Sequence, residues 1–161
     1  MSKRTLTAAI QTFLSLVGAL DAGSLYWAHM KGVSMPCMSG EGCDVVNSSH
    51  WAYISGVPVS LFGALTYIVL LFASVLRLTT DSESTASRVN IFLLVASFCG
   101  TCYSWYLQYI AAFRIGEFCI YCRVSAITMT LILITSVVAQ ALSRASSDKE
   151  APAPAADQNL A

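Results

Sequence analysis

Charged side chains are scarce in this 161-residue sequence: Asp, Glu, Lys and Arg together make up only 11% of it. A typical soluble domain has about 25% charged residues. Hydrophobic residues make up 56% of the chain, and a chain this short has no core large enough to hide so much apolar surface from water. The shortage of charge excludes an ordinary water-soluble domain and predicts a single membrane domain with several spans.

An excess of charge of one sign is also absent. Nine basic residues balance nine acidic ones, so the formal net charge is zero. Proteins that bind nucleic acid carry a strongly basic surface, and nothing in this balance indicates that class.

Long apolar runs, by contrast, are plentiful. A helix needs about 20 apolar residues to cross the ~30 Å hydrocarbon layer of a membrane. Four stretches meet this requirement, at about residues 8–27, 57–76, 90–113 and 118–142. The sequence predicts an all-α membrane protein, with a bundle of four transmembrane helices over residues 1–144. Residues 145–161 are polar, rich in Ala and Pro and without pattern, and are predicted to form a disordered tail.

Basic residues predict the orientation, because they gather on the cytoplasmic side of membranes. If the N-terminus is cytoplasmic, the basic residues inside outnumber those outside: Lys3, Arg4, Arg77, Arg88, Arg144 and Lys149 against Lys31, Arg114 and Arg123. The loop at about residues 28–56 and the start of the fourth helix then share the outer face. In the alternative, the first run is a cleaved signal peptide, which leaves the orientation of the rest unchanged.

Six cysteines are many for a short membrane protein, and four of them fall on the predicted outer side. Cys37 and Cys43 lie in the loop, separated by five residues with two glycines, so the backbone can bend to disulfide distance. Cys119 and Cys122 form a Cys-x-x-Cys pair at the start of the fourth helix, where the helix dipole stabilises a thiolate. Two interpretations follow: a structural loop disulfide beside packing cysteines, or a relay in which the two pairs exchange.

The other two cysteines, Cys99 and Cys102, raise the possibility of a metal site. With Cys119 and Cys122 they have the spacing C-x2-C-x16-C-x2-C, which is typical of tetrahedral zinc. In the predicted bundle, however, the two pairs differ in depth by roughly 10 Å, whereas one zinc ion holds all its sulfurs at about 2.3 Å. We therefore predict no metal, and assign Cys99 and Cys102 to helix packing, with an auxiliary redox role as the alternative.

The segment DVVNSSHWAYISG, which follows Cys43, has apolar and aromatic residues that predict a short helix at the membrane interface. Such a helix would roof the outer end of the bundle. The apolar pocket beneath it suits an isoprenoid quinone as the two-electron acceptor of a dithiol. Asp21 is an acid within the first apolar run, and we assign it a structural role near the outer half of the membrane.

Several stretches, taken in order, resemble the vitamin K epoxide reductase family: Cys37-x5-Cys43-Asp44, NSSHWA, GVPVSLFGALTY and FCIYC. The stretch LDAGSLYWAH before the loop resembles the bacterial members, and the whole resemblance spans about residues 18–125. It implies a four-helix bundle around a quinone of the ubiquinone, menaquinone or vitamin K type, with a two-stage thiol relay.

The resemblance also implies a role for each residue that matches. Cys122 would meet the quinone, Cys119 would exchange with Cys43, and Cys37 would take the mixed disulfide with a partner protein. Ser49 matches a position that hydrogen-bonds near the quinone oxygen. Some bacterial relatives carry a fused thioredoxin-like domain, and only the polar tail follows here, so the expected partner is a separate, soluble thioredoxin-fold dithiol oxidant.

The expected function is thus that of a quinone-linked dithiol:disulfide oxidoreductase that supports disulfide-bond formation. Its expected location is a bacterial inner membrane with both redox pairs periplasmic, and the endoplasmic reticulum is the alternative. Reduction of vitamin K or its epoxide is the alternative purpose. From other classes, a non-catalytic scaffold with a loop disulfide predicts that Cys119→Ser is harmless. A metal-handling protein predicts that Cys99, Cys102, Cys119 and Cys122 are all needed together.

Overall fold

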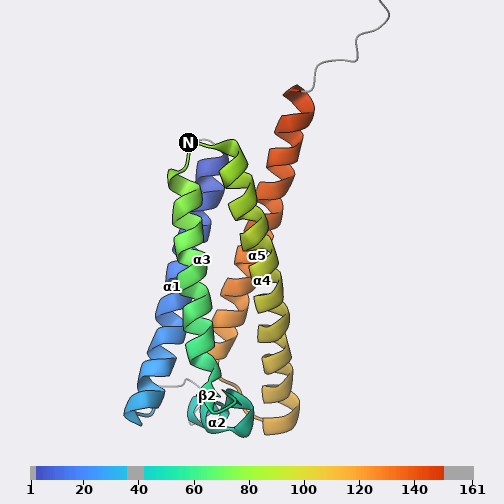
Figure 1. The fold of residues 1–161 in the computed structure, drawn as a ribbon. Helices are drawn as coiled ribbons and strands as arrows, with labels where there is room; N and C mark the ends of the chain where they lie inside the picture. Colours follow the sequence, from blue (N-terminus) through green and yellow to red (C-terminus); the bar gives the residue numbers. More distant parts are fainter. Residues whose placement is uncertain (1–2, 36–41, 151–161) are drawn as a thin grey trace, which may run out of the picture.

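A computed structural model describes residues 3–35 and 42–150 of the chain, with side chains as far as residue 145. Its main elements are four long helices that run side by side (Figure 1): α1 (Lys3–Lys31), α3 (Val59–Thr79), α4 (Glu83–Ile110) and α5 (Ile120–Glu150). Each is long and apolar enough to cross a membrane. The predicted bundle of four transmembrane helices is confirmed.

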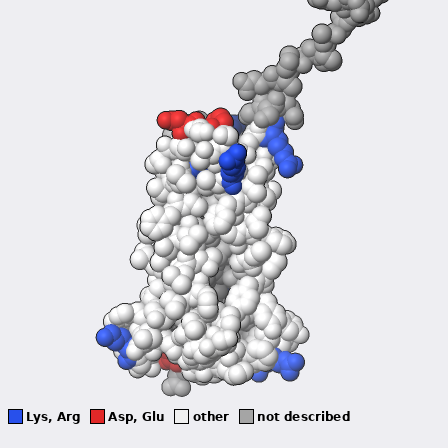
Figure 2. Space-filling model, viewed as in Figure 1, with Lys and Arg blue, Asp and Glu red and all other residues white. Residues whose placement is uncertain are grey.

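The outer surface of this bundle carries many large apolar side chains. Phe13, Leu20 and Phe72 are 65%, 66% and 72% exposed. Figure 2 shows Lys, Arg, Asp and Glu only toward the two ends of the face it displays, with a wide band free of charge between them. Such a band matches the hydrocarbon layer of a membrane, where exposed apolar side chains contact lipid.

The helices extend beyond the predicted apolar runs. The helix α1 begins at Lys3 and ends at Lys31, so it extends beyond both ends of the predicted run 8–27. The helix α5 continues to Glu150, so residues 145–150, which were predicted to belong to the tail, are helical. Hydropathy detects only the part of a helix that lies in lipid, whereas backbone hydrogen bonds continue into the polar layer. The rest of the predicted tail, residues 151–161, lies outside the described residues.

Between α1 and α3 the chain forms a small cap over one end of the bundle, which we name the capped end (Figure 1). The cap consists of α2 (Gly42–Ser48), η1 (His50–Ala52), β1 (Tyr53–Ile54) and β2 (Val57–Pro58). The short helix predicted to roof the bundle is therefore present.

The two short strands of the cap explain why α3 begins later than predicted. Ser55 and Gly56 both have positive φ, +52° and +83°, as a two-residue type I′ hairpin turn requires. Val57 precedes Pro58, which disfavours the helical conformation, so Val57 pairs with Ile54 in the hairpin instead. The helix starts after the proline, at Val59.

A tight turn at the capped end leads the chain from α4 into α5. After α4, one π-helical turn, η2 (Ala111–Ile115), is closed by Gly116, whose φ is +77°. The Gly116 N–H donates to the Ala111 carbonyl oxygen at 2.9 Å, a helix ending that glycine adopts without a Cβ penalty. This turn places the Cys-x-x-Cys pair directly beside the cap.

Polar side chains join the helices at the opposite end of the bundle. Arg77 is only 4% exposed and donates to Gln11 Oε1 at 2.6 Å and to Thr7 Oγ1 at 3.3 Å. Gln11 in turn donates to Ser136 Oγ of α5 at 2.8 Å. Hydrogen bonds of this kind hold membrane helices together where no hydrophobic force acts between them.

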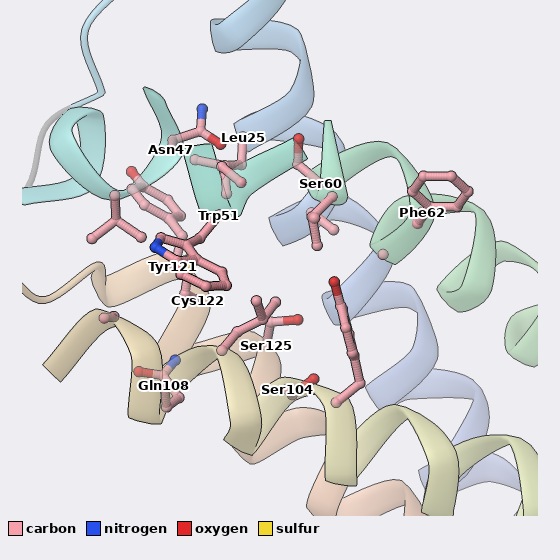
Figure 3. A pocket seen from close by; sticks show the side chains of 18 of the residues that line it. Leu25, Asn47, Trp51, Ser60, Phe62, Ser104, Gln108, Tyr121, Cys122 and Ser125 are labelled. Atoms are coloured by element: carbon pink, nitrogen blue, oxygen red, sulfur yellow. The ribbon is translucent and has the colours of Figure 1, made fainter. Parts of the chain in front are cut away.

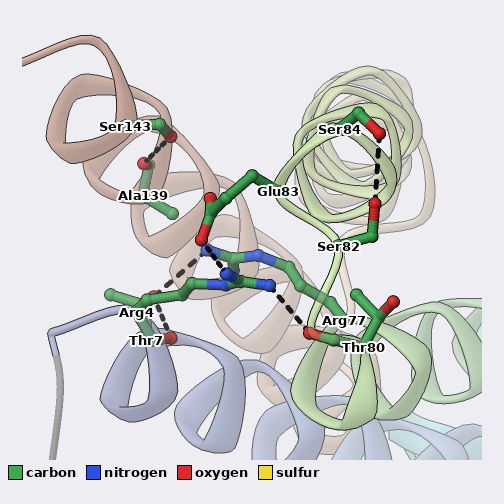
Figure 4. Close-up of polar contacts among 9 residues, drawn as sticks. All are labelled: Arg4, Thr7, Arg77, Thr80, Ser82, Glu83, Ser84, Ala139 and Ser143. Carbon is green, nitrogen blue, oxygen red and sulfur yellow. Dashed lines mark hydrogen bonds and ion pairs between the residues drawn. The ribbon is translucent and has the colours of Figure 1, made fainter. Parts of the chain in front are cut away.

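The loop between α3 and α4 is fixed to α1 at the same end (Figure 4). Arg4 forms an ion pair with Glu83 and donates to the Thr80 carbonyl oxygen at 2.8 Å. Glu83 lies in the first turn of α4, and Thr80 follows α3. One arginine near the start of the chain thereby ties three helices together.

Candidate active site

Cys119 caps the helix that carries Cys122. It directly precedes Ile120, the first residue of α5, and its sulfur accepts a hydrogen bond from the backbone N–H of Cys122 at 3.3 Å. Its carbonyl oxygen accepts the N–H of Arg123 at 3.1 Å. A side-chain acceptor at this position satisfies one of the free N–H groups that every helix start leaves.

The capping position changes the acidity of Cys119. Its pKa is lowered, chiefly by the hydrogen bond with the Cys122 side chain, while burial and the charge of Asp21 act in the opposite direction. The thiolate is the nucleophile in thiol exchange. Cys119 is therefore the chemically activated member of the pair, although its side chain is fully buried.

The cap brings Cys43 to the same place. Cys43 is fully buried and disulfide-bonded, and Cys119 and Cys122 are free thiols. Gly42 lies against the residues before α5: a Cβ there would be 2.7 Å from the Phe118 carbonyl oxygen and 3.0 Å from Glu117 Oε2.

This close approach needs a glycine, because no real Cβ is found so near a backbone oxygen. The residues next to Cys43 and next to Cys119 are thus in direct contact. Cys37, the fourth predicted redox cysteine, lies outside the described residues.

A pocket lies beneath the cap, with walls from α1, α3, α4 and α5 (Figure 3). It encloses about 1070 Å³, including its open mouth, and its surface is mostly apolar. Cys122 and Ser49 line it, whereas Cys119 does not. Phe62 of α3 and Tyr103 of α4 also line the pocket, and both are partly exposed on the membrane-facing surface. The pocket therefore extends from Cys122 to partly exposed side chains of α3 and α4.

Two hydroxyls of the pocket differ in how they are satisfied. The Ser49 hydroxyl donates to the Val46 carbonyl oxygen at 2.7 Å, so its hydrogen is already engaged within the cap. Ser60 is only 9% exposed, and its Oγ has no hydrogen-bond partner within the described residues. A buried hydroxyl without a partner costs free energy, and a bound carbonyl group would satisfy it.

Ser60 was missed in the sequence because it stands alone in the apolar run VPVSLFG. The only available signal was that single polar residue in an otherwise apolar stretch, and a serine in a membrane helix ordinarily bonds to its own backbone. The mostly apolar walls, the free thiol of Cys122 and the unsatisfied Ser60 hydroxyl together fit a quinone ring, which is flat, apolar and carries carbonyl oxygens.

Asp21 of α1 also lines the pocket. It is the only acidic residue among the described residues of the lining, and no Lys, Arg or His is found there. Its charge acts on the thiols of Cys119 and Cys122 and on the phenol of Tyr67. The sequence predicts a structural role for Asp21, whereas its place is in the pocket wall.

Cys99 and Cys102 do not pack inside the bundle as predicted. Both side chains are exposed on the outside of α4. The small residue that does pack is Gly100, where a Cβ would lie 3.0 Å from the sulfur of Met129. Because Gly100 turns toward α5, the two cysteines beside it face away from the bundle and from the buried Cys119.

These features define a membrane protein with a free dithiol between a disulfide-bonded cap and an apolar pocket. The chain matches the vitamin K epoxide reductase family over residues 9–137, a stretch that contains all six cysteines, and it belongs to this family. Its members are oxidoreductases associated with quinones. The predicted family, the general class of oxidoreductase and the integral membrane nature are thereby confirmed.

Proposed function

We propose that this protein is a quinone-dependent dithiol:disulfide oxidoreductase that supports disulfide-bond formation. Electrons would pass from a thioredoxin-fold partner through Cys37/Cys43 and then Cys119/Cys122 to a membrane quinone. The observation that carries this proposal is the order of three neighbours at the capped end. The disulfide-bonded Cys43 adjoins the contact with Phe118, Cys119 follows Phe118 in the chain, and Cys122 lines the pocket.

The burial of Cys43 supports different roles for the two cysteines of the cap. Its sulfur is inaccessible to the thiolate of a partner protein. We assign its disulfide to Cys37, and the attack of the partner to the Cys37 sulfur. That attack breaks the Cys37–Cys43 bond, forms a mixed disulfide on Cys37 and frees Cys43 as a thiolate. The second thiol of the partner then breaks the mixed disulfide and leaves both cysteines reduced.

Exchange inside the protein follows the same chemistry. When Cys119 and Cys122 form a disulfide, the Cys43 thiolate attacks the Cys119 sulfur and Cys122 leaves as a thiolate. Cys37 then attacks Cys43 and releases Cys119. The Cys119/Cys122 pair has gained two electrons, and the Cys37–Cys43 disulfide is formed again.

The pocket would hold the final acceptor, a quinone of the ubiquinone, menaquinone or vitamin K type. A bound quinone supplies a sink for two electrons and two protons. Ser60 would donate to a carbonyl oxygen, and the apolar walls would exclude water from Cys122. We propose that the capped end faces the periplasm of a bacterial inner membrane. Most basic residues lie at the opposite end of the bundle, and basic residues gather on the cytoplasmic side.

Quinone reduction by the purified protein, driven by a reduced thioredoxin-fold partner, tests the proposal. We expect turnover in the wild type, none in Cys122→Ser, and full turnover in the matched control Cys99→Ala/Cys102→Ala, whose cysteines face lipid. Absence of turnover in the wild type, with ubiquinone, menaquinone and vitamin K each tried, would contradict it. Turnover with vitamin K epoxide alone would favour the epoxide-reducing purpose.

A further inference from the structure

Asp21 is in an unusual position for an ionisable residue. It lies within a transmembrane helix, in the wall of an apolar pocket, and no basic residue is among the described residues that line this pocket. An acid inside a membrane is costly, and such residues commonly take part in proton movement or ligand binding. The Asp21 carboxylate makes no hydrogen bond to the described residues, and the Ser24 hydroxyl donates only to the Asp21 backbone carbonyl oxygen. Its carboxylate does not serve as a helix clamp.

The other titratable groups around the pocket do not supply a base that could accept a proton from the dithiol. Tyr67 comes from α3, Tyr103 from α4, and Tyr121 and Cys122 from α5. The Tyr67 hydroxyl is committed, since it donates to the Ser125 carbonyl oxygen at 2.7 Å. Oxidation of a dithiol releases protons, and a site closed to water by a cap needs a group that accepts them. Among these groups a carboxylate is the natural base at neutral pH.

We propose that the Asp21 carboxylate accepts the proton that Cys122 loses when it forms a disulfide with Cys119. This inference rests on the proposed function. In the step, the S–H bond of Cys122 breaks, the bond to the Cys119 sulfur forms, and two electrons pass to the quinone-class acceptor. The proton moves to an Asp21 carboxylate oxygen, from which it is delivered to the reduced acceptor. The reduced acceptor takes up two protons, and the second one comes from solvent. It balances the proton that Cys119 released to solvent when it ionised.

The reaction of Cys122 with N-ethylmaleimide, in the absence of any quinone, shows whether Asp21 acts as a base or only through its negative charge. The background is Cys119→Ser/Cys99→Ala/Cys102→Ala with the cap disulfide intact, so that Cys122 is the one free thiol. If Asp21 acts as base, Asp21→Asn slows the reaction about tenfold near neutral pH and shifts its pH profile upward. If Asp21 acts only through its negative charge, its removal favours the thiolate and the reaction becomes faster. A faster or unchanged rate overturns the proposal.

The full reaction supplies a second measurement in the otherwise wild-type protein. We expect Asp21→Asn to lower kcat for quinone reduction about 100-fold, in the range for the loss of a general base, while KM for the quinone stays near the wild-type value. Asp21→Glu should restore part of kcat. The matched control is Asp81→Asn, because Asp81 is an exposed acid in the loop between α3 and α4, at the end of the bundle opposite the cap, and lies outside the pocket.

The outcomes keep the two proposals apart. A wild type that reduces no quinone contradicts the proposed function, whereas the N-ethylmaleimide rates still test Asp21. A loss of affinity with unchanged kcat in Asp21→Asn overturns the role in proton transfer and makes Asp21 a binding residue. If Asp21→Asn fails to fold, Asp21→Ser replaces it, with the same expected rates.

Discussion

The sulfur of Cys119 accepts a hydrogen bond from the backbone N–H of Cys122, 3.3 Å away, so one thiol of the pair caps the helix that carries the other. The reactivity of the two thiols is therefore unequal before any ligand binds. The pKa of Cys119 is lowered, with the Cys122 side chain as the main cause. Cys119 is thus the better leaving group when Cys37 attacks Cys43, and Cys122 lies beside the pocket.

The unequal acidity predicts different results for two substitutions of Cys122. Serine keeps a donor toward the Cys119 sulfur, whereas alanine removes it. We expect the pKa of Cys119 to stay low in Cys122→Ser and to rise in Cys122→Ala, measured by the ultraviolet absorbance of the thiolate against pH. Both variants carry Cys99→Ala/Cys102→Ala and keep the cap disulfide intact, so that Cys119 is the thiol that titrates. Equal midpoints in the two variants would contradict the assigned cause.

The same shift has a consequence for stability against pH. Because folding lowers the pKa of Cys119, its ionisation stabilises the folded state at pH values above the pKa of the unfolded thiol. This contribution is lost as the pH falls through the folded pKa. Thermal unfolding of Cys122→Ser in detergent should accordingly gain more from alkaline pH than unfolding of Cys122→Ala.

The contact between Gly42 and Phe118 predicts the rate of exchange between the two pairs. In Gly42→Ala the new Cβ would lie 2.7 Å from the Phe118 carbonyl oxygen, so α2 must move away from the start of α5. We expect electron transfer from reduced Cys37/Cys43 to the Cys119–Cys122 disulfide to slow about tenfold or more, since displacements near 1 Å have large effects on reactions between fixed groups. Trapping of the redox states with an alkylating reagent after rapid mixing measures this rate.

Gly23→Ala is the matched control for the cap, because a Cβ at Gly23 in α1 meets no atom within 4 Å. It should exchange at the wild-type rate. If both glycine variants behave alike, the close approach at Gly42 does not limit exchange.

The bundle was predictable from the sequence because lipid imposes a simple rule on it. Apolar runs of about 20 residues must be helical, since every backbone group needs a partner in a membrane. The order of the cysteine pairs was enough to place Cys119 and Cys122 beside the cap. Helix ends were less predictable, because hydropathy does not register the polar turns of α1 and α5 that extend beyond the lipid.

The direction in which side chains point was the part that the sequence did not determine. Cys99 and Gly100 are adjacent small residues, and only the rotation of α4 decides that Gly100 packs on Met129 while Cys99 faces lipid. Asp21 and Ser60 stand singly on two different helices. Their meeting at one pocket depends on how α1 and α3 pack, which no spacing along the chain reveals.

The Ser60 hydroxyl is expected to contribute measurably to the affinity for quinone. Its buried Oγ has no hydrogen-bond partner among the residues that the structure describes, whereas Ser49 already donates within the cap. A new hydrogen bond is worth about 1 kcal/mol. We expect Ser60→Ala to weaken quinone binding about fivefold, and Ser49→Ala to have a smaller effect. Quenching of tryptophan fluorescence by a titrated quinone measures both, because Trp51 lines the pocket. A larger loss in Ser49→Ala would reverse the assignment.

The burial of Arg77, at the end opposite the cap, predicts that removing its partner Gln11 alone is more destabilising than removing both residues. Gln11→Leu removes the acceptor of the 2.6 Å bond and leaves a buried guanidinium without it, at a cost of about 2–3 kcal/mol. Adding Arg77→Met removes the charge as well, so the double variant should be more stable than Gln11→Leu alone. Thermal unfolding in detergent measures the series.

The control for this series is Thr135→Val, whose hydroxyl donates within its own helix to the carbonyl oxygens of Leu131 and Ile132. It should change stability little. Because the network of Gln11 and Arg77 lies at the end of the bundle away from Cys119 and Cys122, folded Gln11→Leu protein should exchange thiols at the wild-type rate. A double variant less stable than Gln11→Leu would mean that Arg77 contributes through contacts other than its bond to Gln11.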